Sequence, residues 1–118
     1  DEAGVTTEFN LNLLARLNGD LGADFVLSNW RHRAVYNAHA DQIEMYLDSL
    51  VDQAVHFPEA DRTFRFARGE ALLTELSRKF DPLELVSWFA ERGFRCVSRW
   101  SDASEYVGLL LLRRDAVR

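Results

Sequence analysis

The sequence has few of the residues that mark disulfide-bonded, membrane-spanning or nucleic-acid-binding proteins. Its one cysteine, Cys96, cannot form an internal disulfide, so we expect a reducing, cytoplasmic location. The longest apolar stretch, residues 107–112, is far too short to span a bilayer, and no secretory signal pattern is found. Lys and Arg number 14 against 19 Asp and Glu. The resulting net charge of −5 argues against a nucleic-acid partner.

Clustered glycines and closely spaced histidines are also missing. The six glycines are scattered, and none belongs to a Gly-rich turn between a strand and a helix that would bind a dinucleotide-like cofactor. His32 and His39 are seven residues apart, so on one strand they would face opposite sides, and His56 lies in another β-prone run. This spacing predicts no metal site.

The chain is nevertheless rich enough in apolar residues to fold. It has 118 residues, of which 47% are hydrophobic. Ordering them costs on the order of 180 kcal/mol, at roughly 1.5 kcal/mol per residue. Most apolar side chains must therefore be buried. The first predicted element is a helix from about Thr7 to Asn18 or Leu21, with a threonine cap at its start and Gly22 among its stop signals.

Short β-prone runs follow the helix. They are residues 34–36, 43–47, 54–57 and 64–66, and the turns between them predict an antiparallel meander of about four strands. Residues 67–80 are also predicted to be extended, because two sets of side chains alternate along them. One set is Leu72, Thr74 and Leu76, and the other is Leu73, Glu75 and Ser77.

The last part of the chain predicts a helix followed by a β-hairpin. Asp81-Pro82 is typical of a helix start and Gly93 of a stop, and residues 94–100 and 106–113 are the two strands. The predicted fold is thus α+β. Residues 107–112 are apolar on both faces, as in a strand buried inside a larger sheet, which a two-stranded hairpin cannot provide. Because the chain also starts with Asp1 rather than Met, we expect a fragment of a longer protein.

Three stretches resemble one enzyme family. They are "DEAGVTTEFNLNLLARLN", "QIEMYLDS" and "FARGEALLTELSRKF", and the terminal hairpin with "WSD" in its turn also fits. Together they are similar to the C-terminal portion of the bacterial histidine Nα-methyltransferases. These enzymes use S-adenosylmethionine (SAM) to trimethylate L-histidine to hercynine, the first step towards ergothioneine.

The resemblance implies that the chain contains parts of two domains. Residues 1–79 would belong to the substrate-binding, histidine-recognition domain. Residues 80–118 would be the last helix and hairpin of a class I methyltransferase domain with a Rossmann-like sheet. The SAM site, together with a tyrosine and an asparagine that hold the amino acid's backbone groups, would lie before residue 1. The partner of this chain would then be the N-terminal remainder of the same enzyme, and the chain alone would be inactive.

The resemblance also implies the residues that recognise histidine. Glu75 and Ser77 match the pair that binds the imidazole ring, and residues two apart on a strand face the same side. A partly buried Glu75 would reject analogues that lack a ring nitrogen. Met45 matches a methionine lining the ring pocket, where a thioether packs well on an aromatic ring. Thr6 lies in a segment near the active site. No catalytic, cofactor-binding or metal-binding residue is predicted.

Each of these residues has a simpler interpretation when the resemblance is set aside. Glu75 and Ser77 could be solvated residues of a turn, Met45 a filler of the core, and Thr6 a helix cap. Two other functions also remain open. One is a methyltransferase of the same fold acting on another amine, such as a tryptophan derivative. The other is a non-catalytic binding or dimerisation module, in which exposed sheet edges favour self-association.

Overall fold

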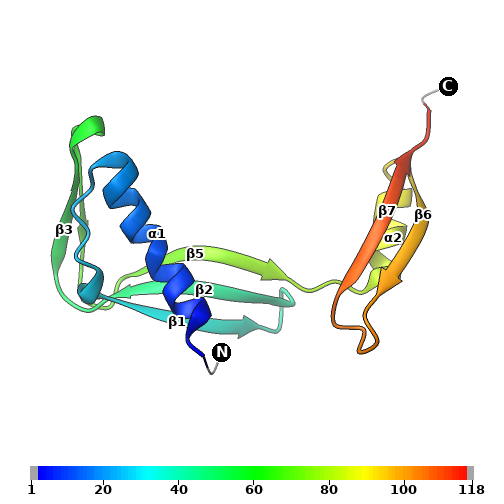
Figure 1. Cartoon of the computed structure of the whole chain (residues 1–118), viewed down its shortest axis with the longest axis horizontal. Helices are drawn as coiled ribbons and strands as arrows, with labels where there is room; N and C mark the ends of the chain where they lie inside the picture. The colour runs from blue at the N-terminus through cyan, green and yellow to red at the C-terminus, as the bar shows by residue number, and fades with distance from the viewer. Residues whose placement is uncertain (1–2, 117–118) are drawn as a thin grey trace. The chain divides into compact units, whose positions relative to one another are not determined.

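The computed structural model describes residues 3–116, which form an α+β fold with antiparallel strands (Figure 1). This fold class confirms the sequence prediction. The chain divides into two compact units, Asp1–Arg78 and Lys79–Arg118. Within residues 3–116, no helix is both long and apolar enough to cross a bilayer.

The first unit begins with helix α1, Val5–Leu21. Its N-cap is Gly4 in the left-handed region at φ 70°, without a side-chain cap hydrogen bond, so the predicted threonine cap is wrong. A glycine adopts this conformation at little cost, which lets the helix start two residues before Thr7. At the other end, Gly22 at φ 62° donates its N–H to the carbonyl of Leu17, as the sequence predicts for a glycine stop.

Three strands form the sheet against which α1 packs. They are β1 (Trp30–Asn37), β2 (Gln42–Ser49) and β5 (Ala71–Arg78), in the order β1-β2-β5, all antiparallel. A short 3₁₀ helix, η1 (Leu27–Asn29), precedes β1.

The remaining two strands of this unit form a separate hairpin, and here the topology differs from the predicted meander. Strands β3 (Gln53–Phe57) and β4 (Arg62–Phe66) pair only with each other and are joined through the 3₁₀ helix η2 (Pro58–Ala60). Two backbone hydrogen bonds join the two ends of the segment that contains this hairpin. The N–H of Ser49 donates to the carbonyl of Glu70, and the N–H of Gly69 donates to the carbonyl of Ser49, each at 2.8 Å. The free edge of β2 is thereby available to β5.

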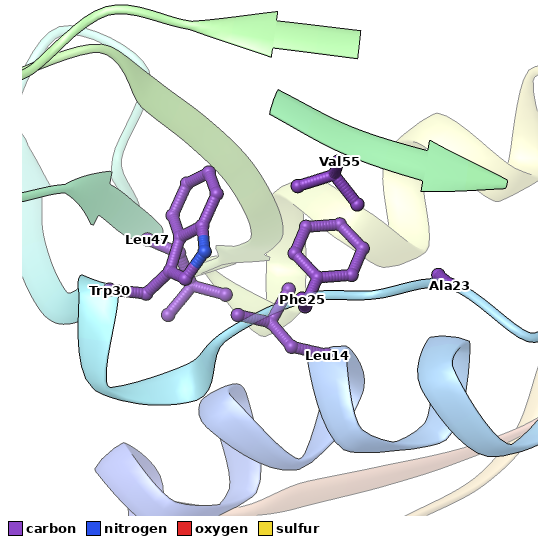
Figure 2. Packing of buried hydrophobic residues seen from close by; sticks show 6 residues of the cluster. All are labelled: Leu14, Ala23, Phe25, Trp30, Leu47 and Val55. Atoms are coloured by element: carbon purple, nitrogen blue, oxygen red, sulfur yellow. The ribbon is translucent and has the colours of Figure 1, made fainter. Parts of the chain in front are cut away.

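The core of the first unit lies where α1, the sheet and the hairpin meet (Figure 2). Figure 2 shows its six buried members: Leu14, Ala23, Phe25, Trp30, Leu47 and Val55. Aromatic rings connect its parts, with Phe25 and Trp30 at 5.8 Å and Trp30 and Phe66 at 5.0 Å between ring centroids. Leu47 on β2 is fully buried. On α1, Leu14 faces this core, whereas Phe9 is 68% exposed.

The second unit is helix α2 (Pro82–Ala90) followed by strands β6 (Phe94–Ser101) and β7 (Gly108–Arg114). The side chain of Asp81 caps α2 by accepting from the N–H groups of Leu83 and Glu84, as predicted. Phe89 of α2 contacts Phe94 of β6, with ring centroids 5.8 Å apart. The apolar side chains of Trp100, Leu109 and Leu111 are each more than half exposed within this unit.

Candidate functional site

Three of the four predicted site residues share one face of the β1-β2-β5 sheet. Met45 on β2 lies directly opposite Glu75 on β5, and Ile43 lies opposite Ser77. Directly paired residues lie on the same face, with Cβ atoms about 4.5–5.5 Å apart. Residues two apart on one strand also share a face, and lie about 7 Å apart. A methionine, a carboxylate and a hydroxyl are therefore neighbours at one end of this face.

These side chains are more open than the sequence interpretation assumes. Glu75 is exposed, while Met45 and Ser77 are half-buried. The expectation of a partly buried Glu75 does not hold within residues 3–116. The physical reason is that β5 is an edge strand, and the apolar cluster that includes Leu72 ends before Glu75 is reached.

Thr6, the fourth predicted residue, lies in the first turn of α1 and is half-buried. It precedes Asn10 by one helical turn, so the two residues are on the same side of the helix. The buried Asn10 side-chain amide donates to the carbonyl oxygen of Tyr46 on β2 at 3.2 Å. Thr6 is thus on the side of α1 that faces the strand carrying Met45.

Asn10 also fixes a histidine of the neighbouring strand. Its Nδ2 lies 2.9 Å from Nδ1 of His32 on β1. The Asn10 amide nitrogen can only donate, so this contact is a hydrogen bond when Nδ1 of His32 is the accepting nitrogen of the ring. These two contacts of Asn10 join α1 to both β1 and β2.

A β-bulge next to Met45 was not foreseen. Met45 pairs with Glu75, but the next residue, Tyr46, pairs with Leu73, so Thr74 is an extra residue on β5. The Thr74 hydroxyl donates to the carbonyl oxygen of Met45 at 3.0 Å. The predicted alternation is therefore wrong across the bulge: Leu72 shares a face with Glu75 and Ser77, and Leu73 shares the other face with Leu76.

The opposite face of the sheet carries a connected set of charged and polar groups. Arg33 donates to Asp48 through Nε and Nη2 at 2.8 and 2.9 Å, and the Arg33 guanidinium lies 4.5 Å above the Tyr46 ring. The Tyr46 hydroxyl donates to Glu44 at 2.6 Å. Arg33 thus has Asp48 as its partner on this face, although its side chain is 42% exposed.

These contacts shift proton affinities in opposite directions. The Arg33 hydrogen bonds hold the pKa of the Asp48 carboxyl below its ordinary value. Hydrogen bonds from Tyr46, Asn37 and Gln42 lower the pKa of Glu44, and the bond to Glu44 raises the pKa of Tyr46. All of these groups flank Met45 along β1 and β2, so they brace the strands behind the candidate site without facing it.

Two cavities of the structure lie away from Met45 and Glu75. One cavity of about 560 Å³ is lined by residues of the β3–β4 hairpin and its neighbours, including Asp52 and Arg65. Another of about 340 Å³ is lined by residues that include Arg31, Arg33 and Arg68. Neither cavity is lined by Met45 or Glu75. Over residues 3–116, no group of three or more His, Cys, Asp and Glu side chains is arranged to hold a metal ion.

Comparison with known proteins gives this geometry a context. Residues 1–114 match the protein family described as "Histidine-specific methyltransferase, SAM-dependent". The chain belongs to this family. It is 42% identical over 114 residues to the histidine N-alpha-methyltransferase of Mycolicibacterium smegmatis (strain ATCC 700084 / mc(2)155), covering 97% of the chain and 36% of that relative. It is 38% identical over 111 residues to the histidine N-alpha-methyltransferase of Mycobacterium tuberculosis (strain CDC 1551 / Oshkosh), covering 94% of the chain and 35% of that relative.

The chain of this histidine methyltransferase family member thus spans about a third of the curated relatives, in their C-terminal portion. The residues that the structure describes do not fit a SAM site. Glycines at positive φ are isolated at helix ends and turns, at Gly4, Gly22, Gly69 and Gly93. All strand pairs among residues 3–116 are antiparallel, without the strand, Gly-rich turn and helix that cradle such a cofactor.

Proposed function

We propose that this chain is the imidazole-recognising part of a SAM-dependent histidine Nα-methyltransferase, called here the parent enzyme. The parent enzyme trimethylates L-histidine to hercynine, towards ergothioneine, in the cytoplasm. The observation that carries the proposal is the placement of Met45, Glu75 and Ser77 on one face of one sheet, in a chain of the histidine-specific family.

The chemistry of the three side chains suits an imidazole ring. An ionised Glu75 carboxylate accepts a hydrogen bond from one ring N–H. The Ser77 hydroxyl donates to the other ring nitrogen or accepts from it, according to the tautomer bound. Met45 packs its thioether on the ring. An indole ring has one nitrogen and can meet only one of these two polar groups, so the Glu75 and Ser77 pair favours imidazole over indole.

The rest of the chain has a supporting part in this proposal. Thr6, in the first turn of α1, lies beside the bound amino acid. The methyl-donor site and the groups that hold the amine and carboxylate of histidine belong to the N-terminal remainder of the parent enzyme. Residues 1–79 are then the substrate-binding domain portion, and residues 80–118 complete the methyltransferase domain. The exposed apolar residues of the β6–β7 hairpin pack against that domain.

The proposal is tested by histidine binding to the parent enzyme, measured by calorimetry. Glu75→Gln removes the charge but keeps the size, and Ser77→Ala removes the hydroxyl. Loss of a charge-assisted hydrogen bond is worth about 1.5–3 kcal/mol, so Glu75→Gln should weaken binding by roughly tenfold to a hundredfold. Ser77→Ala should weaken it by about threefold to tenfold.

The matched control is Glu59→Gln, which changes an exposed glutamate of η2 outside the site and should leave binding unchanged. Tryptophan is the comparison ligand, because a preference for tryptophan over histidine would identify a methyltransferase of another amine. Unchanged histidine affinity in both Glu75→Gln and Ser77→Ala would contradict the proposal.

A further inference from the structure

Strand β5 has one residue more than its partner β2 at the candidate site. Met45 pairs with Glu75 and Tyr46 with Leu73, so Thr74 has no directly paired residue. Strand β2 itself is regular, because its pairing with β1 runs without a shift from Trp30–Ser49 to Asn37–Gln42. The irregularity therefore belongs to β5 alone, which Figure 1 shows beside β2.

The extra residue decides which way Glu75 faces. Leu72 lies opposite Leu47, in the core, and Glu75 lies opposite Met45. Met45 and Leu47 are two apart on a regular strand and share a face, so Leu72 and Glu75 share that face too. Yet Leu72 and Glu75 are three residues apart, and in a regular strand they would face opposite sides.

A regular β5 would thus have to give up one of two functions. With Leu72 kept in the core, Glu75 and Ser77 would turn to the opposite face, because a one-residue slip reverses every side chain beyond it. The bulge at Thr74 lets one strand supply a core leucine and, on the same face, the carboxylate and hydroxyl of the candidate site. Bulges are frequent beside active sites for this reason.

Two side chains hold the chain at this irregular point. A bulge disrupts the ladder, and backbone groups there need other partners. The Thr74 hydroxyl donates to the Met45 carbonyl at 3.0 Å, and Asn10 of α1 donates to the next carbonyl, that of Tyr46, at 3.2 Å. Thr74 is half-buried and Asn10 is 4% exposed, so both bonds are partly shielded from water.

We propose that Thr74 is a positioning residue for histidine recognition: its hydroxyl bond to the Met45 carbonyl maintains the bulge that presents Glu75 and Ser77 beside Met45. This inference rests on the proposed function, because it assumes that Glu75 binds the imidazole. Thr74 itself does not touch the ligand. It acts through the direction in which Glu75 points.

The test compares three variants of the parent enzyme by histidine calorimetry. Thr74→Val keeps the shape of the side chain and removes the donor, and should weaken histidine binding roughly tenfold. Thr74→Ser keeps the donor and should bind within about twofold of the unchanged enzyme. If Thr74→Val does not fold, Thr74→Ala replaces it, and its difference from Thr74→Ser isolates the hydroxyl.

A double-mutant cycle distinguishes positioning from simple destabilisation. In a Glu75→Gln background, Thr74→Val should cause a smaller further loss of affinity than in the unchanged enzyme, because one of the two groups that it positions has already lost its charge. The control is Thr63→Val, which removes a hydroxyl on β4 that lies 3.0 Å from Nδ1 of His56 on β3. It should leave histidine affinity unchanged.

The outcomes separate this inference from the proposed function. If Glu75→Gln weakens binding but Thr74→Val does not, or if their effects add in full, the positioning role of Thr74 is overturned and the proposed function stands. If Glu75→Gln itself has no effect on histidine binding, the proposed function fails, whatever Thr74→Val does.

Discussion

Met45 and Glu75 face each other across β2 and β5, immediately beside the one-residue shift in the register of these strands. The pair joins a thioether suited to an aromatic ring with a carboxylate suited to a ring N–H. Both residues stand on strands that are anchored elsewhere: β2 through buried Leu47 and Asp48, and β5 through Leu72. The candidate site therefore stands on strands that pack into the core at their other ends, which favours a well-defined ligand geometry.

The first prediction concerns Met45. Met45→Ala in the parent enzyme should weaken histidine binding by about twofold to tenfold, because a sulfur–aromatic contact is worth about 0.3–1.5 kcal/mol. Calorimetry measures the change. The control is Leu76→Ala, since Leu76 pairs with Glu44 on the opposite face and is 51% exposed. A larger loss of affinity with Leu76→Ala than with Met45→Ala would place the ligand on the wrong face.

A second prediction concerns the Arg33–Asp48 pair. Asp48→Asn should lower the local stability of the β1–β2 pair by about 1–3 kcal/mol, because Arg33 loses a charged acceptor at a site where Asp48 is 10% exposed. Hydrogen exchange of the strand amides in the parent enzyme measures this. The matched control is Asp20→Asn, whose partner Arg16 forms an exposed i,i+4 pair with no resolvable effect expected.

The same pair predicts a pH dependence with a definite sign. The Arg33 hydrogen bond lowers the pKa of Asp48 in the folded state. The stability that the Arg33–Asp48 pair adds to the folded state is therefore complete when the pH is above 3.8, the ordinary pKa of an aspartate. It is lost as the pH falls through the lowered pKa of Asp48. Asp48→Asn should flatten this part of the stability profile. A variant profile that falls as steeply as that of the unchanged protein would show that Asp48 does not titrate in this way.

A third prediction concerns the core. Leu47→Ala should destabilise the first unit by about 2–5 kcal/mol, because Leu47 is fully buried and its truncation leaves a cavity. Leu73→Ala, at a side chain 52% exposed, should cost far less. Strand-amide exchange is again the measurement. Equal effects of the two substitutions would indicate that the first unit is not packed around Leu47.

A fourth prediction concerns the chain by itself. Its exposed apolar face on the β6–β7 hairpin should make the isolated chain self-associate, as measured by light scattering. Leu109→Lys with Leu111→Lys should reduce that association, because both side chains are more than half exposed. We also expect no hercynine from histidine and SAM with this chain alone. A strictly monomeric isolated chain, or one that forms hercynine, would contradict the respective expectation.

Local patterns predicted most of the elements, and the reasons are visible in particular residues. Asp81-Pro82 and Gly22 act through their own backbone neighbours, so the start of α2 and the end of α1 follow from sequence alone. The pairing of β5 with β2 could not be predicted in this way, because it depends on β3 and β4 forming a separate two-stranded sheet instead of adding to β2. The Gly4 cap was missed because the threonines nearby offer the commoner signal.

In the candidate site, too, some features could be predicted from the sequence and others depend on tertiary contacts. Glu75, Ser77 and Met45 were selected by resemblance, and their spacing alone did not distinguish them from surface and core residues. Thr74 was missed because the alternation of residues 72–77 is unbroken in the sequence. The bulge depends on tertiary contacts: it lets Leu72 pack against the core while Glu75, three residues later, lies on the same face beside Met45. The periodicity of the sequence cannot reveal such a requirement.

The most direct measurement of the central claim is a crystal structure of the parent enzyme with histidine bound. We predict that one imidazole nitrogen lies within hydrogen-bond distance, about 2.7–3.2 Å, of a Glu75 carboxylate oxygen. The other nitrogen should contact the Ser77 hydroxyl, with the ring against Met45. An imidazole ring bound away from these three side chains, or on the Arg33 and Asp48 face of the sheet, would contradict the account.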